Sequence, residues 1–290
     1  MARSAPVAAL LDRFHAARPV RASSLIVTLY GDAIVPRGGS LWLGSLAAIM
    51  ARFRIDAGHV RTAMSRLTAE GWLTRARMGR NSFYRLSRRG EQEFAAATRR
   101  IYFAGEQPFD GRLRVALIGP GIDDRAALRP ALERAGFVAL SPTSYVGVAE
   151  PPPALLGIEG LFFLHGDRGE AGARLAAAAW RLEATGRAYL AFIDAFAPLE
   201  PNLAGIEASD ADALVARTLL IHQFRRVVLR DPHLPAALLP AGWPGAPARA
   251  LAARLYGRLV PPAERFLSEV ARNEHGPLPP PDACFAARFR

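Results

Sequence analysis

Apolar residues recur at helical spacing between positions 57 and 70 and predict an amphipathic helix there. Its apolar stripe consists of Val60, Ala63, Met64 and Leu67. Asp56 can cap the start of this helix, and Gly71 is suited to end it. The opposite face carries Arg61, Thr62, Ser65 and Arg66. One face is therefore expected in a core, and the other is open to solvent or to a partner.

Two shorter helices are expected before this one. Ser23 and Ser24 can cap the first, whose apolar positions follow at 25, 26 and 29. Ser45 can cap the second, which continues through apolar positions 46, 49, 50 and 53. Residues 41–43 between them predict a short strand. Two helices across a tight turn match the spacing of a helix-turn-helix.

A basic hairpin is expected directly after the third helix. Residues 72–77 and 82–86 predict two strands joined by a turn at 78–81. Its basic and polar positions include Arg75, Arg77, Arg80 and Asn81. A polar-faced helix followed by a basic hairpin is the winged-helix arrangement. There the helix reads bases in the major groove and the hairpin contacts phosphates or the minor groove. The helix alone favours an ordinary solvated face, and the hairpin shifts the interpretation to DNA binding.

The pattern changes beyond residue 106. Residues 113–118, 137–140 and 161–164 predict strands, and a helix is expected to begin at Asp123 or Asp124 and to end at Gly136. Together they predict a small α/β unit. From residue 171 the apolar spacing is helical, with a long helix from about 209 to 229 and two further helices through positions 255 and 266.

The distribution of charge separates the chain into two parts. Among 290 residues there are 37 arginines, no lysine and 26 acidic residues, a formal net charge of +11. Residues 1–105 hold 17 arginines and six acidic residues, so the whole excess lies there. GC-rich codon usage explains arginine over lysine, but not why acidic residues are scarce only in the first third. A localised positive charge suits a polyanion such as nucleic acid.

Several other classes of protein are excluded or disfavoured. Cys284 is the only cysteine, which rules out an internal disulfide and a thiolate zinc cluster and fits a cytoplasmic location. No run of 18 uncharged apolar residues exists, so no membrane span is expected. No Ser-His-Asp set, phosphate loop or zinc-protease motif is found, and we expect a chain that is not an enzyme and holds no cofactor or metal.

Short motifs along nearly the whole chain point to a family. In the first third they are Tyr30-Gly31-Asp32, Arg37-Gly38-Gly39, 42–46, 60–63, 66–67, 70–73 and 79–84. In the last third they are 221–232, 238–240, Trp243, 278–279 and Arg288-Phe289. These motifs strongly resemble the phenylacetic acid degradation repressor (PaaX) family over about residues 22–290.

The resemblance implies an α+β chain of successive domains. We expect an N-terminal arm over 1–21 and a winged helix-turn-helix DNA-binding domain with a linker helix over 22–105. A ferredoxin-like domain similar to the Cas2 nuclease would follow over 106–170, as a spacer or dimerisation module. A mainly helical effector or dimerisation domain over 171–272 and a Pro-rich tail over 273–290 would complete the chain.

The resemblance also implies a function. The chain would repress genes of aromatic (phenylacetate-type) catabolism and leave its operator when an aryl-acetyl-CoA such as phenylacetyl-CoA binds. The family's two tryptophans around Asp-Gly are absent from residues 109–113, which leaves a related acyl-CoA open as the effector. One helix and one hairpin cover only a half-site, so we expect a homodimer on near-palindromic double-stranded DNA.

A polar helix face in the last third is the candidate effector site. His222, Arg225 and Arg226 share that face at spacings of three and four, and arginine can recognise phosphate. The expected effector-binding residues are His222, Arg225, Arg226, Arg230 and Trp243. A purely structural cluster, with an arginine paired to Asp231 and His222 satisfied in the interior, is equally open.

Two other functions compete with a ligand-responsive repressor. A metal-dependent nuclease would use the Cas2-like domain, but such nucleases need an acidic residue where the first strand ends, and here Ile118 runs into Gly119-Pro120. A sequence-independent architectural DNA-binding protein would show no ligand response and little base preference.

Overall fold

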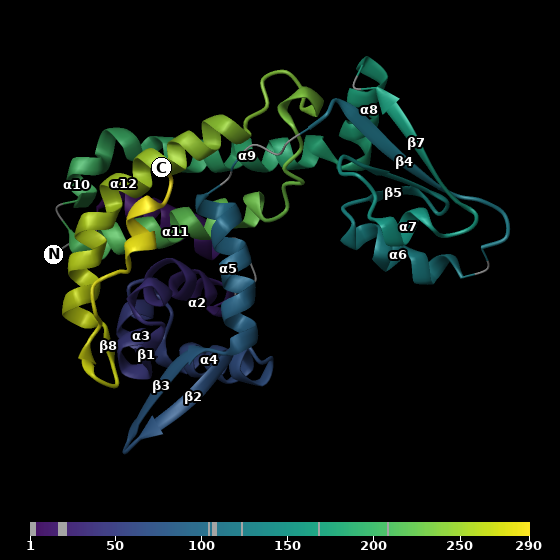
Figure 1. Cartoon of the computed structure of the whole chain (residues 1–290). Coiled ribbons are helices and arrows are strands. Elements are labelled where there is room, and N and C mark those ends of the chain that lie inside the picture. Colours follow the sequence, from purple (N-terminus) through teal and green to yellow (C-terminus); the bar gives the residue numbers. More distant parts are fainter. Residues whose placement is uncertain are drawn as a thin grey trace. The chain divides into compact units, whose positions relative to one another are not determined.

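The computed structural model describes residues 4–16, 22–103, 105, 109–122, 124–167, 169–207 and 209–290 (Figure 1). The chain forms two compact units, each assembled from separate stretches of sequence. The first unit comprises Met1–Ala104, Leu190–Leu229 and Ala246–Arg290. The second unit comprises Gly105–Tyr189 and Arg230–Gly245.

The first unit begins with helices and a small sheet. The helices are α1 (Ala5–Ala16), α2 (Ala22–Leu29), α3 (Leu43–Ala51), α4 (Ala57–Ala69) and α5 (Arg88–Tyr102). A π-helical turn η1 (Tyr30–Ile34) and a 3-10 turn η2 (Val35–Arg37) follow α2. The strands are β1 (Ser40–Trp42), β2 (Leu73–Met78) and β3 (Asn81–Leu86). They form an antiparallel sheet in the order β1-β3-β2, in which Leu41 and Arg75 both lie opposite Tyr84.

Several local predictions for this region are confirmed, and two predicted caps are wrong. Ser23 and Ser24 lie inside α2 and do not cap it. Asp56 caps α4, and Gly71 adopts the left-handed conformation (φ +76°) just after it. Ser45, however, lies inside α3 and does not cap it. Its hydroxyl donates to the carbonyl of Val270 (2.9 Å) and accepts from the Arg272 amide (3.1 Å). A distant partner therefore takes the hydroxyl that local capping would have used.

The C-terminal helices complete the first unit. They are α9 (Leu182–Phe196, which spans the boundary between the units), η3 (Ala197–Asn202), α10 (Leu203–Glu207), α11 (Asp210–Val228) and α12 (Gly245–Val270). Ser209 caps α11, as the sequence indicates. The two helices expected through 255 and 266 are one helix, which continues through Pro261 and Pro262. Its apolar side chains are buried along its whole length, and this packing outweighs the usual helix-breaking effect of proline.

The two ends of the chain pack into the first unit. Within the expected arm, Val7 and Leu11 of α1 are fully buried. The tail contains a short hairpin of β8 (Arg272–Asn273) and β9 (Gly276–Pro277) and a 3-10 turn η5 (Ala283–Ala287). Arg288 is buried. The segments expected to be an arm and a tail are therefore parts of a core.

The second unit is built on a four-stranded antiparallel sheet in the order β5-β6-β4-β7. Its elements are β4 (Arg112–Ile118), α6 (Arg125–Arg134), β5 (Val138–Ser141), β6 (Ser144–Gly147), α7 (Pro153–Leu156), β7 (Leu161–Asp167), α8 (Glu170–Ala179) and η4 (Ala236–Leu238). Asp124 caps α6, whereas Asp123 lies outside the described residues. One core includes Phe137 and Tyr145, and a second joins Leu113 to residues of α8 and η4.

The α+β class is confirmed, but the compact units do not follow the successive domains expected from the sequence. The reason is tertiary packing. α11 contacts α1, α2 and α5, so a helix from the last third shares a core with the first hundred residues. Segments 190–229 and 246–290 consequently belong with the N-terminal helices, and 230–245 belongs with the sheet of the second unit.

Candidate functional site

α4 presents the predicted polar face to solvent, and its start is fixed by a local cap. Asp56 Oδ1 accepts from the amides of Gly58 (2.8 Å) and His59 (3.0 Å). Hydrogen bonds from His59 and Gly58 lower the pKa of the Asp56 carboxyl to about 2. Val60 and Met64 are fully buried on the inner face. This packing sets the rotation of the helix and thus the direction of its outer face.

The outer face holds four exposed residues in different states. They are Arg61, Thr62, Ser65 and Arg66. Arg61 makes no side-chain hydrogen bond or ion pair with any other described residue. Thr62 donates its hydroxyl to the Gly58 carbonyl (3.1 Å). Arg66 bonds to Ser23 of α2 and lies 3.4 Å from a carboxylate oxygen of Glu70. Arg61 thus keeps all its donors available, whereas Arg66 is held against the protein.

The β2-β3 hairpin carries a second group of exposed cations. Arg75 donates to Ser82 Oγ from Nε (3.1 Å) and Nη2 (2.8 Å), and Arg77 Nε donates to the Gly79 carbonyl (3.2 Å). At the turn, Arg80 and Asn81 are exposed and make no side-chain hydrogen bond within the described ranges. The tip of the hairpin therefore offers donors that the protein itself does not use.

Glu274 in the tail forms hydrogen bonds with two strands of this sheet, and sequence reasoning did not predict it. Glu274, in the β8-β9 turn, accepts from the hydroxyl of Ser40 in β1 and from Arg85 Nη2 in β3 (2.7 Å). The hydrogen bond from Ser40, with Arg85 and His275 as further contributors, lowers the pKa of the Glu274 carboxyl. No local pattern near residue 274 marks it, because its partners lie about 190 to 230 positions away.

The predicted effector residues on α11 face α2. His222 is buried, and its Nδ1 lies 3.0 Å from Thr28 Oγ1. Arg225 donates from Nε to Thr28 Oγ1 (2.8 Å) and from Nη2 to the carbonyl (3.0 Å) and hydroxyl (2.9 Å) of Ser24. Burial, and then the charges of Arg225 and Arg226, lower the pKa of His222 to about 3. Arg226 is exposed.

The remaining predicted effector residues belong to the second unit. Arg230 is exposed, and the ring of Trp243 meets that of Tyr189 edge to face at a centroid distance of 6.0 Å. The structure thus brings His222 and Arg225 together and assigns Arg230 and Trp243 to a different unit. The pairing of Arg225 or Arg226 with Asp231, part of the structural alternative, is not found among the described ion pairs. Tyr189 donates to Asp231 instead (2.6 Å).

A pocket lies in the first unit where α2, α5 and α11 meet. Its walls are largely apolar and include Phe94, Ile101 and Ile221, and its polar lining includes Thr28 and Arg225. Trp72, between α4 and β2, also borders it.

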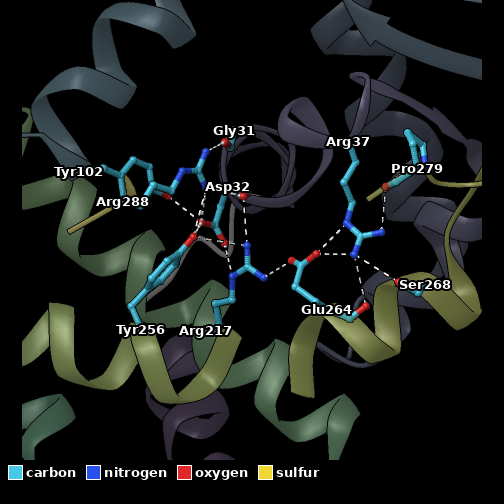
Figure 2. Close-up of polar contacts among 10 residues, drawn as sticks. All are labelled: Gly31, Asp32, Arg37, Tyr102, Arg217, Tyr256, Glu264, Ser268, Pro279 and Arg288. Atoms are coloured by element: carbon cyan, nitrogen blue, oxygen red, sulfur yellow. Dashed lines mark hydrogen bonds and ion pairs between the residues drawn. The ribbon is translucent and has the colours of Figure 1, made fainter. Parts of the chain in front are cut away.

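A buried polar network, which sequence reasoning also missed, is centred on Asp32 of η1 (Figure 2). Its carboxylate accepts from Tyr102 (2.7 Å), Tyr256 (2.9 Å) and Arg217 Nε (2.8 Å). Arg288 donates to the Asp32 carbonyl (2.6 Å), and its guanidinium lies 4.2 Å from the centroid of the Tyr102 ring. Burial and the neighbouring carboxylate of Asp32 raise the pKa of Tyr102. The network joins η1 to α5, α11, α12 and the tail.

The network extends through Glu264 of α12 to η2 (Figure 2). Glu264 accepts from Arg217 Nη1 (2.5 Å) and from Arg37 Nε (2.7 Å). Arg37 also donates to the Pro279 carbonyl (3.1 Å) and to Ser268 Oγ (3.2 Å). These partners lie far from the two arginines in sequence, so burial and pairing depend on the assembled fold.

Two further properties bear on function. In the ranges described, no three His, Cys, Asp or Glu side chains gather into a group that could hold a metal ion. Among the same residues, no helix is both long enough and apolar enough to cross a membrane.

Comparisons with known proteins identify relatives of the chain. Residues 21–90 match the family model for PaaX-like proteins, and residues 180–269 match the model for the PaaX-like protein C-terminal domain. The transcriptional repressor PaaX of Escherichia coli (strain K12) is 38% identical over 303 residues, which covers 96% of this chain and 94% of the relative. A solved structure, the uncharacterized protein Rv0674 from Mycobacterium tuberculosis, is 24% identical, with a TM-score of 0.46 over 76% of this chain and 89% of its own.

Proposed function

Because the chain belongs to the PaaX-like family, we propose that it is a transcriptional repressor that binds double-stranded DNA and is not an enzyme. The observation that carries this proposal is the outer face of α4. Arg61 is exposed there and has no partner among the described residues, and Arg80 and Asn81 at the tip of the following hairpin are equally unpartnered. The target genes would be those of phenylacetate-type aromatic catabolism.

The arrangement of α2, α3, α4 and the β1-β3-β2 sheet supports the winged-helix interpretation. In this proposal α4 enters the major groove, where Arg61 and Arg66 bind guanine and Thr62 and Ser65 reach bases or phosphates. Arg75, Arg77, Arg80 and Asn81 of the hairpin contact the backbone or the adjacent minor groove. Arg66 must exchange its contacts with Ser23 and Glu70 for DNA, whereas Arg61 need not.

The second unit supports a proposed role as a spacer or dimerisation module. Its strand order β5-β6-β4-β7, antiparallel throughout, is that of a ferredoxin-like sheet. A homodimer would place two copies of α4 on the two halves of a near-palindromic operator. Against the nuclease alternative, β4 ends at Ile118 and continues into Gly119, so it supplies no terminal acid.

An acyl-CoA effector, phenylacetyl-CoA or a related thioester, would release the repressor. It would do so by binding a DNA-incompetent state more tightly than the DNA-competent one. Arg226, an exposed cation on α11, would bind its phosphates. The free acid lacks the phosphates and is expected not to release DNA.

Binding to DNA selected from a random pool tests the proposal, because the selection itself yields the preferred sequence. Arg61→Ala and Arg66→Ala should each weaken binding to the selected sequence by about 1–3 kcal/mol, roughly 5- to 150-fold, and relax its base preference. Arg80→Ala should weaken selected and scrambled sequences alike and reduce the slope of log affinity against log salt by about 1.

Arg254→Ala is the matched control, because Arg254 is an exposed arginine of α12 paired with Glu200 (2.7 Å). It should bind both DNAs like the intact protein. Equal affinity of the intact protein for selected and scrambled DNA would favour the architectural alternative. Unchanged affinity in all three α4 and hairpin variants would refute the assigned DNA surface.

A further inference from the structure

The pocket of the first unit has the size and lining of a site for one small apolar group. The pocket is open to solvent and has a volume of about 180 Å³. Its apolar wall includes Val27, Phe94, Ala97, Ile101, Ile221 and Leu229. An apolar cavity of about 150 Å³ in another protein is large enough to bind benzene. The space therefore suits a single aromatic ring or a short alkyl chain.

Arg225 gives this pocket a polar end. Its side chain is largely buried, yet its hydrogen-bond acceptors are the neutral oxygens of Thr28 and Ser24, and no carboxylate lies within ion-pair distance among the described residues. Burial, with the nearby charge of Arg226, lowers the pKa of Arg225. Arg217, in the network around Asp32, differs from Arg225 because it forms ion pairs with two carboxylates. Asp32 and Glu93 line the same pocket, but neither forms an ion pair with Arg225. Burying this guanidinium is therefore costly, and an oxygen acceptor on a ligand would offset part of that cost.

We infer that this pocket is the acyl-group subsite of the effector: it takes a ring-sized apolar acyl group, whose carbonyl oxygen accepts a hydrogen bond from Arg225. The inference rests on the proposed function, which supplies an acyl-CoA as the effector. A carbonyl oxygen next to an apolar group is common to a thioester and to the free aryl carboxylate. The experiment therefore includes both sources.

The walls of the pocket connect it to the proposed DNA surface. Trp72 borders the pocket and stands between the end of α4 and the start of β2, and its ring meets that of Phe94 at a centroid distance of 6.2 Å. A Cβ atom on Gly31 would lie only 2.9 Å from the Phe94 ring, so η1 and α5 are already in close contact there. A ligand that shifts Phe94 or Trp72 consequently acts on the elements that hold α4 and the hairpin.

Filling the pocket tests this inference without removing any polar group. Ala97 lines the pocket on α5, whereas Ala96 on the same helix is exposed. Ala97→Leu should lower the affinity for phenylacetyl-CoA at least tenfold in calorimetry, measured beside its affinity for the selected DNA. It should also abolish release of that DNA by the thioester. Ala96→Leu makes the same chemical change outside the pocket and should bind and respond like the intact protein.

A second pair of variants tests the polar end and covers the case in which Ala97→Leu fails to fold, as judged by its thermal melt. Arg225→Gln should weaken phenylacetyl-CoA at least tenfold, and Arg226→Gln should weaken it less, because only Arg225 lines the pocket. Coenzyme A without an acyl group and free phenylacetate are the two comparison ligands.

The outcomes separate the inference from the proposed function. If the thioester binds equally to the intact protein and to the Ala96→Leu and Ala97→Leu variants, the pocket is not the acyl subsite, and the thioester remains the proposed effector. If coenzyme A binds as tightly as its thioester, the acyl group contributes nothing and the subsite is refuted. If phenylacetate binds and the thioester does not, and Ala97→Leu blocks that binding, the pocket is a site for the apolar group but its ligand is the free carboxylate. If no ligand binds the intact protein, both the effector and its subsite fail, while DNA binding is judged separately.

Discussion

Arginine side chains are exposed and unpaired in one region of the first unit and buried in ion pairs in another, among the described residues. On α4 and at the hairpin tip, Arg61 and Arg80 are exposed and have no partner among the described residues. Around Asp32, Arg217 is fully buried and contacts two carboxylates, Asp32 and Glu264. The residue type is the same in both regions, so its surroundings alone decide whether it stabilises the fold or remains available to a ligand.

The difference follows from desolvation. Removing a guanidinium from water is costly, and it is tolerated where carboxylates and aromatic faces replace the water, as they do around Arg217 and Arg288. An exposed guanidinium keeps its hydration and can exchange it for a phosphate or a base edge. The buried region should therefore respond to mutation in its stability, and the exposed region in its binding.

The largest effect is expected from Asp32→Asn. The change keeps the shape of the side chain but removes the carboxylate that Arg217 and Arg288 share. Leaving buried cations without this charge should lower the free energy of unfolding by about 3–5 kcal/mol, measured by urea denaturation. Asp12→Asn is the control, because Asp12 pairs with Arg54 at the surface (2.5 Å) and should change stability by at most about 1 kcal/mol. Similar losses in the two variants would contradict the comparison.

An intermediate effect is expected from the pH dependence that His222 confers. Burial, with the charges of Arg225 and Arg226, lowers the pKa of His222 to about 3 in the fold, against about 6.5 in an unfolded chain. Below pH 6.5 the unfolded chain therefore binds a proton that the fold excludes, so the free energy of unfolding falls as the pH drops. The contribution is complete above pH 6.5.

His222→Gln should consequently flatten the curve of urea midpoint against pH between 6.5 and 4.5. His275→Gln, which alters an exposed histidine, serves as its control and should keep the slope of the intact protein. An unchanged slope in His222→Gln would mean that other groups govern the acid sensitivity.

The smallest effect on stability is expected from Arg61→Ala. Because Arg61 is exposed and makes no polar side-chain contact within the described ranges, its removal should change the free energy of unfolding by no more than about 0.5 kcal/mol. Its loss of DNA affinity should be far larger. Thermal melts and gel shifts on the same preparations provide both numbers. A marked destabilisation would show that Arg61 also supports the fold.

Local signals in the sequence predicted the elements of the proposed DNA surface well. Asp56, the stripe from Val60 to Leu67 and Gly71 fixed the start, rotation and end of α4. These signals act over a few residues, through capping and periodic burial, and they hold whatever the rest of the chain does. Ser45 marks the limit of such reasoning, because its hydroxyl bonds to the backbone after α12 instead of capping α3.

The effector residues were predictable only as a helix face. Spacing placed His222, Arg225 and Arg226 together, but it could not show that Arg225 turns toward Thr28 and Ser24 and that Arg226 stays exposed. Nor could it show that Arg230 and Trp243 belong to the other unit. Those outcomes depend on which distant helix covers α11.

The helix, cap and hairpin of the first third, its excess of positive charge, the α+β class and the family could all be predicted from the residues alone. Which arginines are buried, how the C-terminal segments join the N-terminal helices and where a pocket remains depend on how the helices pack. Periodicity and capping are properties of neighbouring residues. Burial and ion pairing depend instead on contacts between residues far apart in sequence, such as Asp32 and Arg288, which are 256 positions apart. A single sequence shows no local trace of such contacts, because they form only when the helices pack.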